Sequence, residues 1–362
     1  MAEKAWRIGF NGRPFCSNEL RGLGRHTLEL IKGLKAQHPE LEIFLYTYAP
    51  VTEEFKKLLP YATVRDRRVR PKLLWDLWSL RAQLAEDQID LYHSTINLGV
   101  PLLFFKKLPL VVTIHDHFTH VAQRPLWGRL QYAVEFALLR RSQLVFTVSA
   151  DAREKIARLM GIRREKIRVS YNGVGLAPVA APPVEERYFL YVGGMEARKN
   201  ISVLLEAFLS FHQREPTSRL KLVGNPEHAS ARDRDLIQAH ADIIEVVQGA
   251  GDAQLAALYQ GARALIFPSL EEGFGLPLIE AMALGCPVIA SDIEVFKEIG
   301  ADAALYFPRA SASALTEQMR GLEADAELRD RLCARGRERA RKFRWETLVA
   351  QTYEAYCELL RK

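Results

Sequence analysis

The chain has 362 residues, of which 48% are hydrophobic, 26% charged and 9% aromatic, with a formal net charge of +6. This composition is ordinary for a globular protein, and the length is sufficient for two domains. The four cysteines are Cys16, Cys286, Cys333 and Cys357. Because they are widely separated, the sequence predicts no zinc ribbon, redox motif or disulfide framework. The positive charge favours anionic partners, or is a mild excess without a specific partner.

The N-terminal segment, residues 1–15, lacks the apolar core and the small-residue cleavage site of a secretory signal. No uninterrupted apolar run approaches the roughly 20 residues of a membrane-spanning helix. The best candidate, residues 98–114, is interrupted by Pro101, Pro109 and two lysines. We therefore expect a cytoplasmic protein that is soluble or peripheral on the inner face of a membrane.

Short apolar runs alternate with segments of helical periodicity along the first half of the chain. The first predicted strand, WRIGFN, is followed by a glycine-bearing loop, RGLGR, and a helical segment, HTLELIKGL. Further predicted strands are IFLYTYA, LYHST, LVVTIHD and LVFTVS. Alternation of this kind predicts a parallel sheet covered by helices. Residues 177–186 contain three prolines among small residues and are predicted to be a linker.

The alternation restarts after the linker. Predicted strands are YFLYVGG, LKLVG, IIEVVQG, ALIFPS and PVIAS, and the chain becomes wholly helical and basic beyond about residue 311. The arginines at 335, 337, 339 and 341 are interpreted as a solvated helix face. Two doubly wound domains are expected to face a central cleft, where such folds bind ligands at the carboxyl ends of their strands. The predicted boundaries are 1–176 for the first domain, 187–343 for the second domain, and 344–362 for a C-terminal helix.

The segment EEGFGLPLIEAMALGCP, residues 271–287, places two glutamates in apolar surroundings. Pro277 suits a first helical position, which predicts Glu280 in the first helical turn and Glu272 in the preceding loop. Glycines let backbone N–H groups approach a phosphate at a helix start. A carboxylate nearby can bind two adjacent ribose hydroxyls, so the segment indicates a nucleotide site. Alternatively, Glu280 only complements the helix dipole, which contributes about 0.3 to 1 kcal/mol.

A second glycine-bearing strand end, YVGGMEARKN, carries Arg198 and Lys199 at the start of a helix. Arginine offers a planar fork of donors and lysine a compact charge, a pair suited to a diphosphate. Because both strand ends belong to the same predicted domain, these cations can reach the same phosphates. The alternative is an ordinary surface pair.

These segments, together with DAQLAALYQGARALIFPS, resemble the retaining glycosyltransferases of family 4, which have the GT-B fold. The N-terminal half agrees with the same family in the segments IGFNGRPF, RGLGRHTLEL, YHS, VVTIHD, VFTVSADARE and IRVSYNGV. The resemblance covers nearly the whole chain, and its motifs follow the order of the family. It implies that residues 1–176 form an acceptor-binding domain, that residues 187–343 form a nucleotide-sugar-binding domain, and that the helix of residues 344–362 packs back on the first domain.

The resemblance implies roles for the second-domain residues. Glu280 would bind the nucleotide ribose, and Glu272 would lie beside the hydroxyls of the donor sugar. Arg198 and Lys199 would hold the diphosphate and stabilise it as it leaves. Gly194 stands where many members carry an arginine, so a substitute role for Arg198 stays open. The turn whose backbone amides would meet the sugar and phosphate comprises Gly273, Phe274, Gly275 and Leu276.

In the first half, Gly22 and Gly24 match the glycine loop that approaches the donor phosphate or the acceptor. His115 matches the histidine that contacts the transferred sugar. His115, Asp116, His117 and His120 have a spacing that could also indicate a metal site. We expect instead one donor-facing histidine among polar loop residues, and no metal. The Asp233-Arg234-Asp235 string is interpreted as surface.

The resemblance implies a metal-independent, retaining transfer from a nucleotide sugar, with no cofactor. The ARKN form of the basic motif favours a mannosyltransferase and GDP-mannose, with UDP-sugars as the alternative. Retention is expected through attack on the face that the diphosphate leaves, and a covalent glycosyl-enzyme is the alternative. Two other readings are a related GT-B enzyme, either a sugar-nucleotide epimerase or a phosphorylase, and a non-catalytic GT-B scaffold.

The acceptor is expected to be a glycan or a lipid-linked glycan of polysaccharide biosynthesis, and no nucleic-acid partner is expected. Residues 64–84 combine a basic run with an aromatic, amphipathic stretch that contains Trp75 and Trp78. This pattern is typical of a helix on an anionic membrane surface. The alternative is that both tryptophans pack into the core of the first domain.

Overall fold

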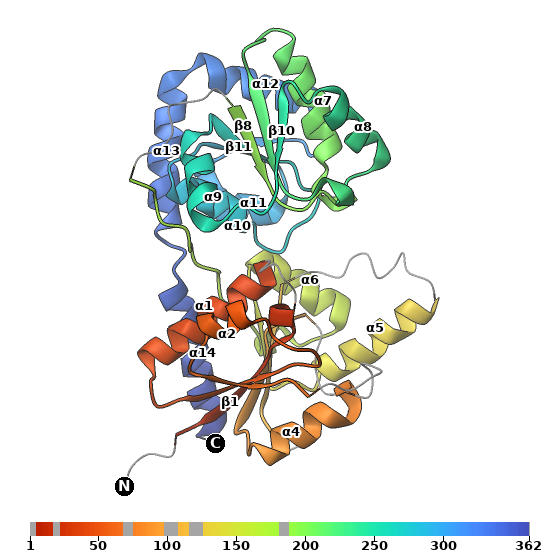
Figure 1. The fold of residues 1–362 in the computed structure, drawn as a ribbon, viewed down its shortest axis with the longest axis vertical. Coiled ribbons are helices and arrows are strands. Elements are labelled where there is room, and N and C mark those ends of the chain that lie inside the picture. Colours follow the sequence, from red (N-terminus) through yellow and green to blue (C-terminus); the bar gives the residue numbers. More distant parts are fainter. Residues whose placement is uncertain are drawn as a thin grey trace. The chain divides into compact units, whose positions relative to one another are not determined.

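The computed structural model describes residues 5–16, 22–67, 75–97, 108–115, 126–180 and 188–361. The side chains of residues 54, 76, 77 and 127–131 are not part of this description. The chain forms two compact units (Figure 1). The first comprises Met1–Gly173 and Trp345–Lys362, and the second comprises Val174–Arg344.

The first unit contains a parallel sheet of seven strands in the order β3-β2-β1-β4-β5-β6-β7. Its strands are β1 (Arg7–Asn11), β2 (Glu42–Tyr46), β3 (Ala62–Arg65), β4 (Leu91–Ser94), β5 (Leu110–Ile114), β6 (Leu144–Thr147) and β7 (Ile167–Val169). The central strands are buried along their whole length, as expected for a sheet covered on both faces. The strand order reverses between β1 and β4, and such a reversal marks the ligand-binding edge of doubly wound sheets.

The helices of the first unit lie between these strands in sequence, except the last, which follows the second unit. They are α1 (Gly22–Gln37), α2 (Glu53–Leu58), α4 (Leu80–Glu86), α5 (Leu126–Leu139), α6 (Ala150–Met160) and α14 (Trp345–Leu360). Shorter turns lie at Arg13–Cys16, Trp75–Ser79 and Arg164–Lys166. Local sequence explains the bounds of α6: the Ser149 hydroxyl caps its first turn, and Gly161 ends it in a left-handed conformation.

The C-terminal helix α14 completes the core of the first unit, beside α1 (Figure 1). The two helices approach closely at Gly33, because a Cβ at this position would overlap Cγ2 of Val349. The Tyr356 hydroxyl lies 2.6 Å from Nδ1 of His93 on β4, and Arg168 on β7 binds the Glu358 carboxylate. The last helix is therefore tied to the sheet as well as to α1.

The second unit has a parallel sheet of six strands in the order β10-β9-β8-β11-β12-β13. Its strands are β8 (Tyr188–Val192), β9 (Arg219–Val223), β10 (Ile244–Val247), β11 (Ala264–Phe267), β12 (Val288–Ser291) and β13 (Leu305–Phe307). Its helices are α7 (Ile201–His212), α8 (Ala231–Ala239), α9 (Asp252–Gly261), α10 (Leu276–Ala283), α11 (Glu294–Gly300), α12 (Ala312–Ala324) and α13 (Ala326–Ala340). Short turns lie at Ala197–Lys199, Pro226–His228 and Ala301–Ala303.

The two doubly wound sheets confirm the predicted fold class. Three strands were not predicted, namely β3, β7 and β13, which have four, three and three residues. The predicted extent of the glycine-bearing loop, RGLGR, was also wrong, because α1 already begins at Gly22. Among the described residues, no helix is both long enough and apolar enough to cross a membrane.

Two surface interpretations hold for most of their residues, since Arg234, Asp235, Arg335, Arg337 and Arg341 are exposed, but each is wrong for one residue. Asp233 is buried, because its carboxylate accepts hydrogen bonds from the hydroxyls of Ser202 and Ser230 at the start of α8. Arg339 is not simply solvated, since its guanidinium donates to the backbone oxygens of Ile299 and Glu298 at the end of α11. Asp233 and Arg339 thus form hydrogen bonds with polar groups at the ends of helices. The sequence around each residue does not indicate these contacts.

Candidate active site

The second unit brings two loops together at the edge where its strand order reverses. β8 and β11 are adjacent and parallel, with Phe189 opposite Ala264. Their carboxyl ends therefore lie at the same edge, and the loops that follow carry the ARKN and glutamate segments. The backbone N–H of Leu270 donates to the Arg198 carbonyl at 2.8 Å, which joins the two loops directly.

Lys199 and Glu272, which lie 73 residues apart, form the centre of this site. Nζ of Lys199 donates to Oε1 of Glu272 at 2.5 Å, and the two side chains are 12% and 11% exposed. The Ser269 hydroxyl donates to the same oxygen at 2.9 Å. Arg198, which is 47% exposed, lies 3.6 Å from Oε2. Three of the predicted catalytic residues thus form one cluster, in which one carboxylate lies beside two cations and a net positive charge remains.

The predicted backbone turn depends on Gly275, which has a φ of +107°. A Cβ here would lie 3.0 Å from a ring carbon of Phe296 and 3.3 Å from one of Phe267. Both the conformation and the close approach therefore require glycine. The neighbouring Phe274 is buried with its ring edge-on to Phe343, at a centroid distance of 5.8 Å. These contacts fix the path of the chain into α10.

Glu280 lies in the second turn of α10, which corrects its predicted place in the first turn. The helix begins at Leu276, so Pro277 occupies its second position. Glu280 is 8% exposed, and its Oε2 accepts a hydrogen bond of 3.2 Å from the Tyr259 hydroxyl. Helix-dipole stabilisation falls off beyond the first turn, so this position weakens the alternative that Glu280 only complements the dipole.

Tyr259 is a residue of the site that the sequence analysis missed. It is fully buried on α9, and burial raises the pKa of its hydroxyl, as does the charge of Glu280. It therefore stays protonated and can donate to the carboxylate. Its segment, AQLAALYQGA, gave only a helical periodicity, which carries no signal that the side chain contacts Glu280.

Gly194 has a neighbour that the sequence did not indicate. A Cβ at this position would overlap the carboxylate of Glu196, so that carboxylate covers the strand end where many family members carry an arginine. Gly194 also accepts a hydrogen bond from the Tyr191 hydroxyl through its carbonyl. The charged partner of Arg198 is Glu272, on the loop that follows β11.

In the first unit, His115 follows β5 directly. Its Nε2 lies 3.0 Å from the Thr95 carbonyl, and its backbone N–H donates to Oδ1 of Asn97 at 2.6 Å. Because a carbonyl only accepts, Nε2 carries the proton and Nδ1 is left as an acceptor. Burial lowers the pKa of His115 to about 4, so the ring is neutral at pH 7.

A second histidine, His26, contacts His115 and was not predicted to belong to the site. Their rings meet edge to face, with centroids 4.5 Å apart. Nδ1 of His26 lies 2.7 Å from Oδ1 of Asn172, and burial lowers the pKa of His26 to about 3. His26 and Asn172 belong to the quoted segments RGLGRHTLEL and IRVSYNGV, but their pairing depends on tertiary packing.

The remaining first-unit predictions have mixed outcomes. Gly22 and Gly24 lie in the first turn of α1, where Gly22 is exposed and Gly24 is buried. Asp116, His117 and His120 lie outside the described residues. Within the described ranges, no group of three histidine, cysteine, aspartate or glutamate residues could hold a metal ion.

Two family models match the chain. Residues 20–177 match the model described as Glycosyltransferase Family 4, and residues 177–339 match that of Glycosyl transferases group 1. The matches meet at residue 177, within the first segment of the second unit.

Similar proteins are named mannosyltransferases. The chain is 28% identical to O-antigen chain mannosyltransferase B from Escherichia coli, over 93% of this chain and 96% of that protein. It is 33% identical to O-antigen chain mannosyltransferase RfbU from Salmonella typhimurium, over 67% and 69%. Its fold is similar to that of HepE from Anabaena in complex with UDP-glucose, with a TM-score of 0.77, 18% identity, and coverage of 97% and 99%.

Proposed function

Because this chain belongs to glycosyltransferase family 4 and is a glycosyltransferase of the GT-B fold, we propose that it transfers mannose from GDP-mannose with retention of configuration and without a metal ion. Two similar proteins carry the name mannosyltransferase, which supports mannose as the sugar. The proposed acceptor is a glycan or a lipid-linked glycan.

The cluster of Lys199, Arg198 and Glu272 is the observation that carries this proposal. Breaking a sugar–diphosphate bond develops negative charge on the leaving oxygen. Preorganised cations stabilise that charge most effectively in a site that excludes water. Lys199 and Arg198 are proposed to bind the diphosphate and to stabilise it as it leaves. This binding would release the Glu272 carboxylate to accept hydrogen bonds from sugar hydroxyls.

Glu280 is proposed to bind the ribose hydroxyls, with Tyr259 holding its Oε2. An ionised carboxylate accepts strong hydrogen bonds, and fixing one of its oxygens orients the group before the nucleotide arrives. The turn of Gly273, Phe274, Gly275 and Leu276 is proposed to offer backbone amides to the sugar and phosphate.

His115 is proposed to accept a hydrogen bond from a hydroxyl of the transferred sugar through Nδ1. The Thr95 carbonyl fixes this tautomer, and the lowered pKa keeps the ring neutral at pH 7. A neutral histidine cannot serve as a proton donor through Nδ1, so its proposed role is to position the sugar. Gly22 and Gly24 are proposed to approach the donor phosphate or the acceptor.

Retention is proposed to proceed by attack on the face that the diphosphate leaves. A covalent glycosyl-enzyme would need a nucleophilic carboxylate at the anomeric carbon. Before the donor binds, Glu272 accepts hydrogen bonds from Lys199 and Ser269 at one oxygen. Once the diphosphate engages Lys199, the proposed role of Glu272 is to accept hydrogen bonds from sugar hydroxyls, not to attack the anomeric carbon.

The experiment is proton NMR of GDP-mannose turnover to water in the presence of EDTA. Retention predicts that α-mannose appears first, before mutarotation produces the β anomer. Initial release of β-mannose would contradict retention, and turnover that requires added magnesium would contradict metal independence. The Lys199→Gln variant serves as the control for background hydrolysis.

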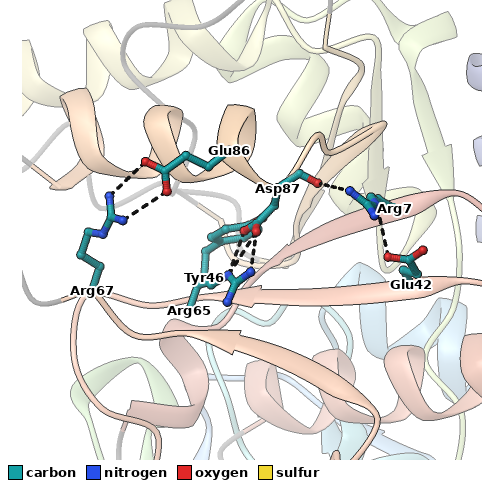
Figure 2. Close-up of polar contacts among 7 residues, drawn as sticks. All are labelled: Arg7, Glu42, Tyr46, Arg65, Arg67, Glu86 and Asp87. Carbon is teal, nitrogen blue, oxygen red and sulfur yellow. Dashed lines mark hydrogen bonds and ion pairs between the residues drawn. The ribbon is translucent and has the colours of Figure 1, made fainter.

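A second proposal, contact with a membrane surface, concerns residues 64–84. The structure reduces the number of side chains in this segment that are available for such contact. Arg65 binds the Asp87 carboxylate at 2.6 Å and Arg67 binds Glu86 at 3.1 Å, so both charges are paired within the unit (Figure 2). Trp75 is fully buried, whereas Trp78 is 62% exposed. The alternative that both tryptophans are core residues is therefore wrong for Trp78.

We propose that Trp78 contacts the membrane interface, where exposed tryptophans are favoured. The basic residues at 68, 70 and 72 lie outside the described residues. Co-sedimentation with anionic vesicles is expected for the wild type and reduced in Trp78→Ala. Equal sedimentation of both proteins would contradict the assignment to this residue.

A further inference from the structure

A pocket of about 530 Å³ lies within the second unit, between the carboxyl end of α10 and the end of α13. Its lining combines three basic residues, Arg337, Arg341 and Arg344, with four apolar ones, Val174, Ala283, Ala340 and Phe343. Its lining includes no acidic residue and no member of the proposed nucleotide site. The pocket therefore combines positive charge with an apolar surface, and neither Lys199 nor Glu272 lines it.

The arginines of α13 differ in how they are engaged. Arg329 donates to backbone oxygens, as does Arg339, whereas Arg331 and Arg335 pair with carboxylates. Among the described residues, no carboxylate or backbone oxygen binds the guanidinium of Arg337 or Arg341. Of the pocket arginines, Arg337 on α13 and Arg341 at its C-terminal end are thus the two whose donors bind no carboxylate or backbone oxygen in the described part of the chain.

Gly285 helps to place the first of these arginines. It follows α10 with a φ of +75°, and a Cβ here would overlap the Arg337 guanidinium. The absence of a side chain lets the guanidinium lie against the backbone at the end of α10. Arg341 follows one helical turn later, so the two guanidinium groups face the same side of α13.

We propose that this pocket binds an organic phosphate. Arg337 and Arg341 would hold the phosphate or diphosphate group through paired N–H donors, the geometry in which arginine recognises phosphate oxygens. The apolar lining residues would contact the organic group that is attached to the phosphate. The volume lies within the range of small-molecule sites, which is about 300 to 1,000 Å³. This inference does not depend on the proposed donor or on the proposed reaction.

Two kinds of ligand carry such a phosphate group: a soluble phosphorylated metabolite and the head group of an anionic phospholipid. The soluble source is tested by calorimetric titration of phenyl phosphate, which carries both a phosphate and an apolar group. The titration is performed with a parent protein that carries Arg198→Gln and Lys199→Gln, so that the cations of the proposed donor site do not contribute. Binding is expected to weaken at least about tenfold when Arg337→Gln and Arg341→Gln are added.

The matched control is Arg331→Gln with Arg335→Gln. It removes the same charge from the same helix, but these arginines pair with Asp325, Glu327 and Asp302 and do not line the pocket. The control should bind phenyl phosphate as the parent protein does. Equal losses in both double variants would show a nonspecific charge effect and would overturn the proposal, as would equal binding by all three proteins.

The lipid source is tested by sedimentation with vesicles of phosphatidic acid in phosphatidylcholine, against phosphatidylcholine alone. Sedimentation that the pocket variant loses and the control variant keeps identifies a phospholipid head group. Phenyl phosphate binding without vesicle binding identifies a soluble phosphate. If the parent protein binds neither probe, the proposal is wrong, whatever the outcome of nucleotide titration.

Discussion

The Tyr259 hydroxyl donates a hydrogen bond to Oε2 of Glu280, at 3.2 Å, from a side chain that is fully buried between neighbouring helices. This hydrogen bond joins α9 to α10. A buried carboxylate is costly unless it is hydrogen-bonded, so this contact both stabilises Glu280 and restricts its orientation. Tyr259 thus supports Glu280, the residue proposed to bind the ribose, and need not contact the nucleotide itself.

Tyr259→Phe should weaken GDP binding about threefold to tenfold, because it removes a charge-assisted hydrogen bond to the Glu280 carboxylate. Such a bond contributes about 1.5 to 3 kcal/mol, and only the part that orients Glu280 is expressed in nucleotide binding. The measurement is calorimetric titration of GDP. Tyr188→Phe is the matched control, since it removes another buried hydroxyl of the same unit, which donates to the Leu258 carbonyl. Equal affinity in wild type and Tyr259→Phe would show that this contact does not position Glu280.

Lys199→Gln should reduce kcat about 10²- to 10³-fold, because it removes a charge that stabilises the leaving diphosphate. Turnover of GDP-mannose measures this effect. Lys221→Gln is the control, since Lys221 is a similarly enclosed lysine that lies over the Tyr188 ring and near Glu245. A loss below about fivefold would place Lys199 outside the transition-state contacts.

The buried histidines predict acid sensitivity of the first unit. The folded pKa values of His115 and His26 are lowered to about 4 and about 3, from 6.5. The unfolded chain therefore binds more protons between these values, and stability falls as the pH is lowered from 7 toward 4. Each histidine should contribute about 2 kcal/mol of this loss between pH 7 and pH 5.

Urea unfolding followed by tryptophan fluorescence measures this loss, because all five tryptophans belong to the first unit. His26→Gln should show a smaller loss between pH 7 and pH 5 than the wild type. His228→Gln, which removes an exposed histidine of the second unit, should behave as the wild type. A pH dependence that is unchanged in His26→Gln would show that this histidine does not control the acid transition.

Gly33→Ala should destabilise the first unit by about 1 to 3 kcal/mol, because the added methyl group overlaps Val349 where α1 packs on α14. Urea midpoints from tryptophan fluorescence report the change. Combination with Val349→Ala should recover part of the loss, since it removes the clashing methyl groups. A strictly additive double variant would contradict a direct contact between these two positions.

The sequence predicted those parts of the fold and site that depend on local patterns. Apolar runs bounded by glycine predicted β8 and β11, and the adjacency of these strands accounts for the meeting of Lys199 and Glu272. Short strands such as β7 and β13 have three residues each, too few for a pattern to distinguish them from loops.

The contacts that the sequence did not predict come from tertiary packing. Tyr259 and Glu280 lie 21 residues apart, and His26 and Asn172 lie 146 residues apart. Neither pair has a spacing that indicates contact within one helix or strand. The sequence also could not predict that Trp75 is buried and Trp78 is exposed. The two residues are three positions apart, a spacing that places both on nearly the same face of a helix.

The central claim is that Glu280 and the Lys199 cluster bind a nucleotide diphosphate without metal. Its most direct test is calorimetric titration of GDP and of UDP, separately, into the protein in EDTA, with Glu280→Ala alongside. We expect GDP to bind, UDP to bind more weakly, and the variant to lose about 3 kcal/mol of affinity for GDP through the loss of two charge-assisted hydrogen bonds. Absence of binding by both nucleotides, or equal GDP affinity in wild type and Glu280→Ala, would contradict the proposed site.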